Sequence, residues 1–215
     1  INSKLSEVNI KSNFINGLRV TDKDTINIVE DVLIEFNKEI VEALNELACK
    51  AKRITSKENS IITVVQENKD LGFVGTPIEI NKEFLTETIK LNEVPVVAPL
   101  GLDKDNQTFN INADTAAGSI AIELKARRLM IISDVEGVLD SEKKLIPEIN
   151  SKKANELIDQ EVISGGMIPK IKNCLDVASN GVKAVVIIDG RKNHSLLFEL
   201  LSDKGSGTLI REWKI

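Results

Sequence analysis

Arg128-Leu129-Met130-Ile131-Ile132-Ser133 is a short and nearly continuous apolar run, and residues 183–188 repeat it as Lys-Ala-Val-Val-Ile-Ile. Runs of this length without polar alternation indicate strands that are buried on both faces of a sheet. Further β-branched or apolar runs lie at 60–66 and at 93–100, the latter with prolines at its borders. Segments with apolar residues at helical spacing lie between these runs. The sequence therefore predicts an α/β fold: a three-layer α/β/α sandwich with a largely parallel sheet.

The helices are predicted from their start signals and from apolar residues at helical spacing. Thr21 is expected to cap a helix that continues to Leu47 as two joined segments. Pro169 suits the first position of another helix, because the N–H that proline lacks is not needed there. The other helices are expected over 81–91, 114–126, 151–160, 169–179 and 193–201.

Composition excludes several classes of function. The chain has 215 residues with a formal net charge of −5, so it lacks the basic face that a nucleic acid or an anionic membrane would need. No apolar run reaches the length of a transmembrane span. His194 is the only histidine, which excludes a multi-histidine metal centre. Cys49 and Cys174 form no Cys-x-x-Cys pair, which fits a reducing compartment.

Two segments lie where ligands bind in open α/β sheets, beyond the carboxyl ends of strands. Ser133 to Asp140 follows directly on a predicted strand, and Gly137 allows a tight turn there. Gly165-Gly166 precedes the start of a helix, where free N–H groups and the helix dipole favour an anion. Lys170 in that first turn opposes the dipole, which a bound phosphate would explain. A locally capped turn and a solvated lysine are the alternatives, and the pattern leaves them open.

Two further segments carry polar side chains in extended stretches. Asn110 and Asn112 alternate along one face, and Asp114 is expected to cap the helix that follows. Arg19 follows an Asn-Gly turn in an apolar segment, and a guanidinium can hold a carboxylate through two parallel hydrogen bonds. Plain helix capping and an ordinary surface arginine remain the alternatives for these two segments.

Taken in order, the segments resemble the acetylglutamate kinases of the amino acid kinase family. Each motif is weak alone, but the ordered set is specific and runs from near residue 1 to residue 211. The matching motifs are Asn16-Gly17-Leu18-Arg19-Val20-Thr21, Asn110-Ile111-Asn112-Ala113-Asp114, Ser133-Asp134-Val135 with Gly137-Val138-Leu139-Asp140, Gly165-Gly166-Met167-Ile168-Pro169-Lys170, and a tail with Ile188-Asp189-Gly190-Arg191, His194 and Gly205-Ser206-Gly207-Thr208.

The resemblance implies a reaction and a set of site residues. The reaction is ATP-dependent phosphorylation of the side-chain carboxylate of N-acetyl-L-glutamate, the second step of arginine biosynthesis. By resemblance, Arg19 and Asn110 bind the substrate, Lys170 stabilises the transferring phosphoryl group, and Asp114 orients the catalytic lysines. Mg²⁺ is expected to accompany ATP, held mainly through the phosphates, with no metal site on the protein. The nucleotide residues are expected to be Asp134, Val135, Glu136, Gly137, Val138, Leu139, Val162, Ile163 and Ser164.

The reaction suits the composition, because the nucleophile is already an anion and needs positioning and positive charge rather than a histidine base. The resemblance further implies one domain over 1–215, with the acyl-amino-acid side at about 1–108 and the nucleotide side at about 109–215. It also implies a cytoplasmic homo-oligomer with a PII-type signalling partner. Lys204 stands where arginine-inhibited members often carry an acid, which leaves arginine inhibition open.

The sequence also departs from the family. The strand with a lysine and a glycine-rich loop and the His-Gly-Gly-Gly-Pro type turn are absent, so the chain is expected to lack the family's N-terminal part and to bind nucleotide without useful turnover. The family's Gly-Leu-Ser-Gly-Lys-Asp-Gly run is replaced by Arg53-Ile54-Thr55-Ser56-Lys57-Glu58-Asn59. Two alternatives follow: a sister kinase for another acylated amino acid, such as an aminoadipate derivative, and a catalytically dead regulatory paralogue.

Overall fold

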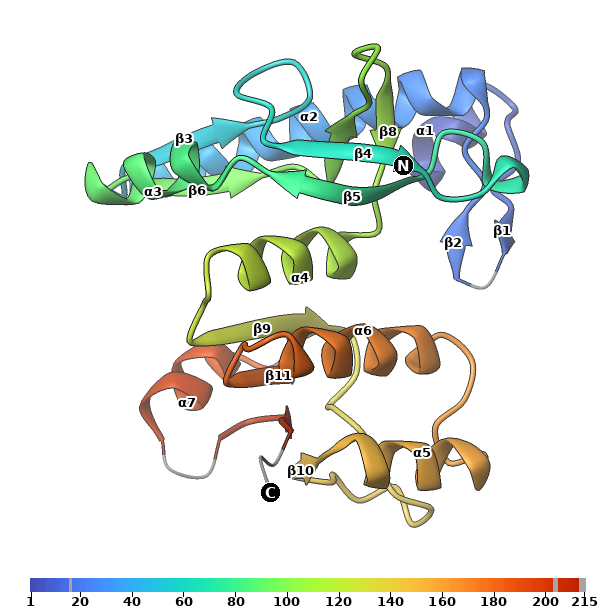
Figure 1. Cartoon of the computed structure of the whole chain (residues 1–215), viewed down its shortest axis with the longest axis vertical. Helices are drawn as coiled ribbons and strands as arrows, with labels where there is room; N and C mark the ends of the chain where they lie inside the picture. Colours follow the sequence, from blue (N-terminus) through green and yellow to red (C-terminus); the bar gives the residue numbers. More distant parts are fainter. Residues whose placement is uncertain (16, 203–204, 213–215) are drawn as a thin grey trace. The chain divides into compact units, whose positions relative to one another are not determined.

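The computed structural model describes residues 1–15, 17–202 and 205–212, so Asn16 of the first motif and Lys204 lie outside the described residues. The chain divides into two compact units, Ile1–Ile120 and Ala121–Ile215 (Figure 1). Strands alternate with helices in both units, which confirms the α/β prediction. The boundary lies twelve residues after the predicted functional division at 108, and that division stays a prediction.

The described residues of the first unit form three small sheets. A hairpin pairs β1 (Phe14–Ile15) with β2 (Leu18–Arg19), and β3 (Ala51–Ile54) runs parallel to β6 (Val94–Val97). The largest sheet has the order β5-β4-β7-β8, in which only β4 and β7 are parallel. Its strands are β4 (Ile62–Gln66), β5 (Gly75–Ile80), β7 (Leu100–Leu102) and β8 (Thr108–Asn110), and the helices are α1 (Asn2–Glu7), α2 (Lys23–Glu46), a 3₁₀ turn at Lys69–Leu71, α3 (Lys82–Lys90) and α4 (Ala113–Glu123).

The second unit is built on one four-stranded sheet of order β10-β12-β11-β9. The two predicted apolar strands are neighbours in it, because β9 and β11 pair in parallel over their whole length. The strands β11 and β12 are antiparallel, so the sheet is mixed. The elements are β9 (Arg128–Ser133), β10 (Glu148–Ile149), α5 (Ser151–Asp159), α6 (Met167–Ser179), β11 (Ala184–Asp189), α7 (Ser195–Leu201) and β12 (Thr208–Ile210).

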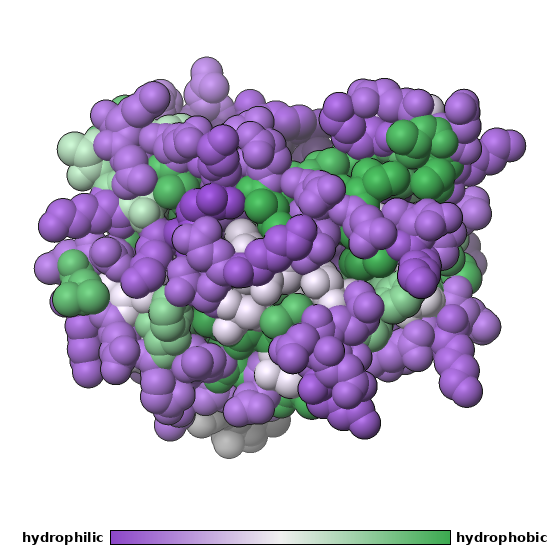
Figure 2. Space-filling view, turned by 90° about the horizontal axis from the view of Figure 1, so that it is seen from above, coloured by the Kyte–Doolittle hydropathy of each residue, from purple (hydrophilic) through white to green (hydrophobic). Residues whose placement is uncertain are grey.

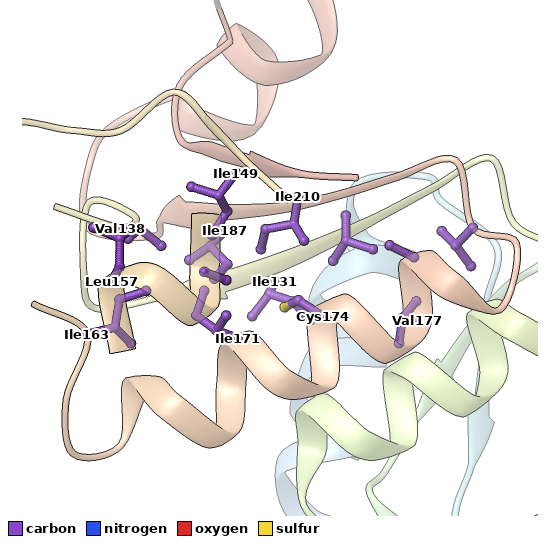
Figure 3. Close-up of a cluster of buried hydrophobic side chains, with 14 of the residues drawn as sticks. Ile131, Val138, Ile149, Leu157, Ile163, Ile171, Cys174, Val177, Ile187 and Ile210 are labelled. Atoms are coloured by element: carbon purple, nitrogen blue, oxygen red, sulfur yellow. The ribbon is translucent and has the colours of Figure 1, made fainter. Parts of the chain in front are cut away.

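Helix α6 covers one face of this sheet. Ile171, Cys174 and Val177 recur at helical spacing on α6, and each is at most 1% exposed. They pack against Ile131 of β9 and Ile187 of β11 in one apolar cluster (Figure 3). Side chains from the loops and the remaining elements complete the cluster, among them Val138, Ile149, Leu157, Ile163 and Ile210.

The structure corrects several local predictions. Helix α2 is one continuous helix, and its cap is Asp22, which accepts from the Thr25 N–H at 2.8 Å. Thr21 is instead fully buried. Helix α6 begins at Met167, so Pro169 occupies its third position rather than its first. Proline costs the helix no intrahelical hydrogen bond at this position, because the first four N–H groups of a helix have no intrahelical partner.

Burial also differs from expectation at three places. In β9, Ile131 is 4% exposed but Ile132 is 59% exposed, because the two side chains point to opposite faces and β9 is an edge strand of its sheet. The run 93–100 forms two short strands, β6 and β7, rather than one buried strand. Helix α7 begins at Ser195, and its apolar residues are mostly exposed, namely Leu196, Leu197, Phe198, Leu200 and Leu201.

The surface is largely polar in the view that Figure 2 gives, with apolar patches between hydrophilic side chains. Among the helices in the described part of the chain, none has both the length and the apolar character that crossing a membrane requires.

Candidate active site

Arg19 lies at the end of the β1–β2 hairpin in the first unit, and its guanidinium is held on two sides. The Nη1 group donates to Ser12 Oγ at 2.6 Å, and Nη2 donates to Asn2 Oδ1 at 2.7 Å. The guanidinium carbon lies 4.7 Å from the centroid of the Phe14 ring. Burial lowers the pKa of Arg19, which nevertheless stays protonated at neutral pH. A positive charge is therefore held in position beside Ser12 and Asn2, the first residue of α1.

Thr21 connects Arg19 with Asn110. Its hydroxyl donates to the Arg19 carbonyl oxygen at 3.0 Å and accepts from Asn110 Nδ2 at 3.3 Å. Thr21 has no exposed surface, so this hydroxyl is a fixed link rather than a solvated group. The structure thus links the backbone of Arg19 to the side chain of Asn110, the two residues that the resemblance assigns to substrate binding.

A segment that the sequence analysis missed, 71–73, completes this arrangement. The Thr21 N–H donates to the Leu71 carbonyl at 2.9 Å, and the Asn110 N–H donates to the Phe73 carbonyl at 2.9 Å. Gly72 has φ +69°, and a Cβ there would collide with the Thr21 carbonyl. The available signal was the run Gly72-Phe73-Val74-Gly75, in which glycines flank two apolar residues.

Asp114 lies in the first turn of α4, but it is not the capping residue. Asn112 Oδ1 accepts from the Thr115 N–H at 3.1 Å and so performs the capping that was expected of Asp114. An acid in the first turn is favoured by the helix dipole. The catalytic role of Asp114 stays a prediction.

The segment 134–139 in the second unit is fixed by Thr208. The Thr208 hydroxyl accepts from the Val138 N–H at 2.8 Å and donates to the Ile146 carbonyl at 2.7 Å. Gly137 has φ +137°, and a Cβ there would lie 2.6 Å from Thr208 Oγ1. Glycine is required here for close approach as well as for the turn. Val138 is 2% exposed and belongs to the apolar core, so only its backbone can face a nucleotide.

A cluster of charged residues at the end of β11, Asp189, Arg191 and Lys192, lies beside this segment. Lys192 Nζ lies 3.0 Å from Glu136 Oε2, and the Gly190 N–H donates to the Ser133 carbonyl at 2.8 Å. Arg191 lies where the carboxylates of Asp189, Asp134 and Glu136 all act on it, and together they raise its pKa. Asp189 and Arg191 belong to the tail motif that resembles the family, but no role was predicted for them from the sequence.

Asp189 anchors this group. Its Oδ1 accepts from Arg191 N–H and Nε, both at 2.9 Å, and its Oδ2 accepts from Nη2 at 3.0 Å. These hydrogen bonds from Arg191 hold the pKa of Asp189 at about 2. The Asp189 carboxylate is therefore ionised at any physiological pH.

The second predicted nucleotide segment, Val162 to Ser164, leads into α6. The N–H groups of Val162 and Ile163 both donate to the Leu157 carbonyl, and Ile163 is buried in the same cluster as Val138. Ser164 is exposed. Among the described residues, no three His, Cys, Asp or Glu side chains lie close enough together to hold a metal ion.

The start of α6 offers fewer donors than the sequence suggested. The N–H groups of Met167 and Ile168 donate to the carbonyls of Ser164 and Gly165, both at 3.2 Å. Lys170 follows at the fourth position of the helix and is partly buried. The positive charge of Lys170, rather than a row of free N–H groups, is what this helix start presents.

Comparison with known proteins agrees with this arrangement of elements and residues. Residues 1–189 match the amino acid kinase family. The chain belongs to the amino acid kinase family.

The curated relatives place it more narrowly, among the acetylglutamate kinases. The chain is 95% identical over 212 residues to the acetylglutamate kinase of Pelagibacter ubique strain HTCC1062, covering 99% of this chain and 74% of that protein. It is 46% identical to the acetylglutamate kinase of Caldanaerobacter subterraneus subsp. tengcongensis, covering 98% of this chain and 72% of that protein.

Solved structures confirm the amino acid kinase-like fold. The structure of smu.665 from Streptococcus mutans UA159 has a TM-score of 0.85 and 31% identity, covering 98% of this chain and 81% of that chain. N-acetylglutamate synthase from Neisseria gonorrhoeae, complexed with coenzyme A and N-acetyl-glutamate, has a TM-score of 0.88 at 21% identity, covering 99% of this chain and 50% of that chain. The latter likeness concerns the fold alone.

Proposed function

We propose that the enzyme that contains this chain catalyses the ATP-dependent phosphorylation of the side-chain carboxylate of N-acetyl-L-glutamate. The product is N-acetyl-L-glutamyl 5-phosphate, in the second step of arginine biosynthesis. The observation that carries the proposal is the 95% identity with an acetylglutamate kinase over nearly the whole chain. The link from the Arg19 backbone carbonyl through Thr21 to the Asn110 amide supports it, because it joins the segment that carries Arg19 to the strand that carries Asn110.

Substrate binding falls to Arg19 and Asn110 in this proposal. The Arg19 guanidinium would pair with the α-carboxylate of the substrate, and charge-assisted hydrogen bonds of this kind are among the strongest in proteins. The Asn110 amide would contact the acetylamino or carboxylate group. Ser12 and Asn2 already orient the guanidinium, so little side-chain freedom remains to be lost on binding.

Phosphoryl transfer then needs no general base, because the attacking carboxylate is already ionised. Lys170 would stabilise the charge that builds up on the transferring phosphoryl group, and Asp114 would orient the catalytic lysines. ATP would lie against the backbone of Asp134 to Leu139 and near Val162 to Ser164. These residues cover the nucleotide side, at about 109–215, while about 1–108 forms the acyl-amino-acid side.

ATP is proposed to bind as its Mg²⁺ complex. When bound, the metal neutralises charge on the phosphate oxygens. Mg²⁺ keeps several waters and is usually held by phosphates with one or two carboxylates. The donor set described above suits a metal carried mainly by the nucleotide rather than by a dedicated cage.

The test of substrate binding is Arg19→Lys in the enzyme that contains this chain. Lysine keeps the charge but loses the planar fork, so the Kd for acetylglutamate should rise by roughly tenfold, with nucleotide affinity unchanged. Titration calorimetry with each ligand measures both. Unchanged acetylglutamate affinity would remove Arg19 from the site. Tighter binding of an N-acylated aminoadipate than of acetylglutamate would favour the sister-kinase alternative.

We further propose a cytoplasmic homo-oligomer that a PII-type signalling protein contacts. The exposed apolar residues of α7 are consistent with a surface that another chain covers, since apolar patches of this kind often mark interfaces. Light scattering of the purified enzyme should give a mass that is a multiple of the protomer. A monomer at micromolar concentration, or no PII binding in surface plasmon resonance, would contradict the respective proposal.

A further inference from the structure

Glu30 is a buried carboxylate in α2, and it has three partners, two in the loop after β3 and one in β8. The residue is 8% exposed. Its Oε1 accepts from Ser56 Oγ at 2.5 Å and from Thr108 Oγ1 at 2.8 Å. Its Oε2 lies 3.4 Å from Lys57 Nζ. One side chain therefore joins α2, the loop after β3, and β8.

This carboxylate carries a charge. Burial alone raises the pKa of Glu30, but the hydrogen bonds from Ser56 and Thr108 and the charge of Lys57 outweigh it, and the pKa is lowered overall. Hydrogen bonds to an ionised acceptor are roughly twice as strong as neutral ones. Glu30 thus holds its partners more firmly than a neutral side chain of the same shape would.

The partner Thr108 lies two residues before Asn110 in β8, so both side chains point to the same face of the strand. Thr108 is held by Glu30, and Asn110 is held by Thr21, which directly precedes the cap of α2. Helix α2 packs against β8 over this region (Figure 1). Two side-chain pairs therefore fix the position of the short strand that carries Asn110.

We propose that Glu30 is a positioning residue for the acyl-amino-acid substrate: through Thr108 it sets where β8 presents the Asn110 amide. The inference rests on the proposed function, because it needs Asn110 as a substrate contact. Glu30 itself does not touch the substrate. The same carboxylate also secures the loop in which Ser56 stands at a glycine position of the family's run, so the serine hydroxyl adds an anchor there.

The test compares Glu30→Gln and Thr108→Val with the unmodified enzyme. Both changes weaken the link to β8, and displacement of a positioning group by about 1 Å can cost up to ~10²-fold. We expect the KM for acetylglutamate to rise about tenfold, the KM for ATP to stay within about twofold, and Thr108→Ser to restore the acetylglutamate KM because it keeps the hydroxyl. The double variant should be no worse than the poorer single one, because both act through one contact.

Ser56→Ala is the matched control. It removes a hydrogen bond to the same Glu30 oxygen but leaves β8 untouched. It should lower the thermal midpoint while changing the acetylglutamate KM by less than about twofold. A KM that rises as much in Ser56→Ala as in Thr108→Val would mean that Glu30 only stabilises the fold, and a KM unchanged in Thr108→Val would overturn the inference.

Asn110→Ala separates this inference from the proposed function. If Asn110→Ala leaves the acetylglutamate KM unchanged, the assignment of Asn110 fails, and the positioning role fails with it. If Asn110→Ala raises that KM while Thr108→Val does not, the substrate assignment stands and only the role of Glu30 is overturned. Thr108→Val removes no charge from the core, so it gives a result even if Glu30→Gln does not fold.

Discussion

Glu30, Asp189 and Arg19 are buried or half-buried, and each has partners at hydrogen-bond distance. Glu30 lies between two hydroxyls and a lysine, Asp189 accepts three hydrogen bonds from Arg191, and Arg19 donates to Ser12 and Asn2. This pairing follows from the cost of removing an isolated charge from water. Charged side chains that hydrogen-bond partners hold in one position are therefore candidates for functional residues.

Lys170 carries the first prediction. Lys170→Ala removes a positive charge near the start of α6, and losing one transition-state stabiliser commonly lowers kcat by on the order of 10²–10³-fold. The KM values should change much less, because in the proposed role the charge of Lys170 acts mainly while charge redistributes on the transferring phosphoryl group. Steady-state kinetics test this, with Lys172→Ala on the exposed side of the same helix as the control. A loss in kcat below about tenfold would remove Lys170 from the reaction.

Asp189 carries the second prediction, which concerns pH. The folded-state pKa of about 2 lies below the value of about 3.9 for an unfolded chain, so this carboxylate stabilises the fold above pH ~4. That contribution is lost as the pH falls from about 4 through 2. Arg191→Met removes the partner and raises the pKa of Asp189, so the variant should melt at a lower temperature above pH ~4 and approach the wild type near pH 2.

Thermal midpoints measured from pH 2 to pH 7 check this expectation. Arg127→Met is the control, because Arg127 is exposed at the other end of the β9–β11 pair. A difference between Arg191→Met and wild type that stays constant across this range would show that Asp189 does not titrate as described.

At the scale of elements, two turns are held by specific atoms of other segments rather than by their own propensity. The 134–139 segment depends on the Thr208 hydroxyl of β12, and the 71–73 segment depends on backbone groups of Thr21 and Asn110. Each turn thereby inherits its geometry from a strand that is distant in sequence. We expect glycines at such contacts to be far less replaceable than glycines in open space.

Gly137 and Gly166 test this contrast. Gly137→Ala places a Cβ 2.6 Å from Thr208 Oγ1 at a positive φ, and strain of this kind costs about 1–3 kcal/mol. For a chain of this size each kcal/mol lowers the thermal midpoint by about 2–4 °C. Gly166 has φ −65° and nothing within 4 Å of an added Cβ, so Gly166→Ala should change the midpoint by less than about 2 °C. Equal midpoints for the two variants in calorimetry would contradict the contact.

The molecule as a whole divides its predicted ligand contacts between two compact units. Arg19 and Asn110 lie in Ile1–Ile120, and the nucleotide segments and Lys170 lie in Ala121–Ile215. Each unit has a buried core of its own, so a local change in one unit need not disturb the packing of the other. This division predicts that the two ligand affinities respond to different substitutions.

Crossed binding measurements test the division. Gly137→Ala should weaken the binding of a fluorescent ATP analogue by roughly tenfold and leave acetylglutamate affinity unchanged, because in the proposed site the turn at 134–139 contacts only the nucleotide. Arg19→Lys should do the reverse. If both variants weaken both ligands to the same extent, the ligands share contacts that the proposed site does not contain.

Much of the local structure follows from short-range pattern. The apolar runs at 128–133 and 183–188 become β9 and β11, and Asn81 caps α3 by accepting from the Phe84 N–H at 3.0 Å. Such features depend on residues within one turn or one strand, where hydrophobic period and capping chemistry act directly. The ordered motifs that carry the family resemblance are local in the same sense, which is why the kinase family could be named from the sequence.

Only the tertiary structure shows which residues far apart in sequence are hydrogen-bond partners. Thr21 and Asn110 are 89 residues apart, and Glu30 and Thr108 are 78 apart, yet each pair shares a hydrogen bond. The position of each strand in the sheet likewise decides burial. Ile132 is exposed because β9 is the edge strand, whereas Val186 is buried because β11 lies inside the sheet. The sequence pattern shows that a polar residue needs a hydrogen-bond partner or that an apolar residue needs to be covered by other side chains. Which atoms meet is settled by the packing of whole elements, because a side chain's neighbours come from segments that no local spacing relates.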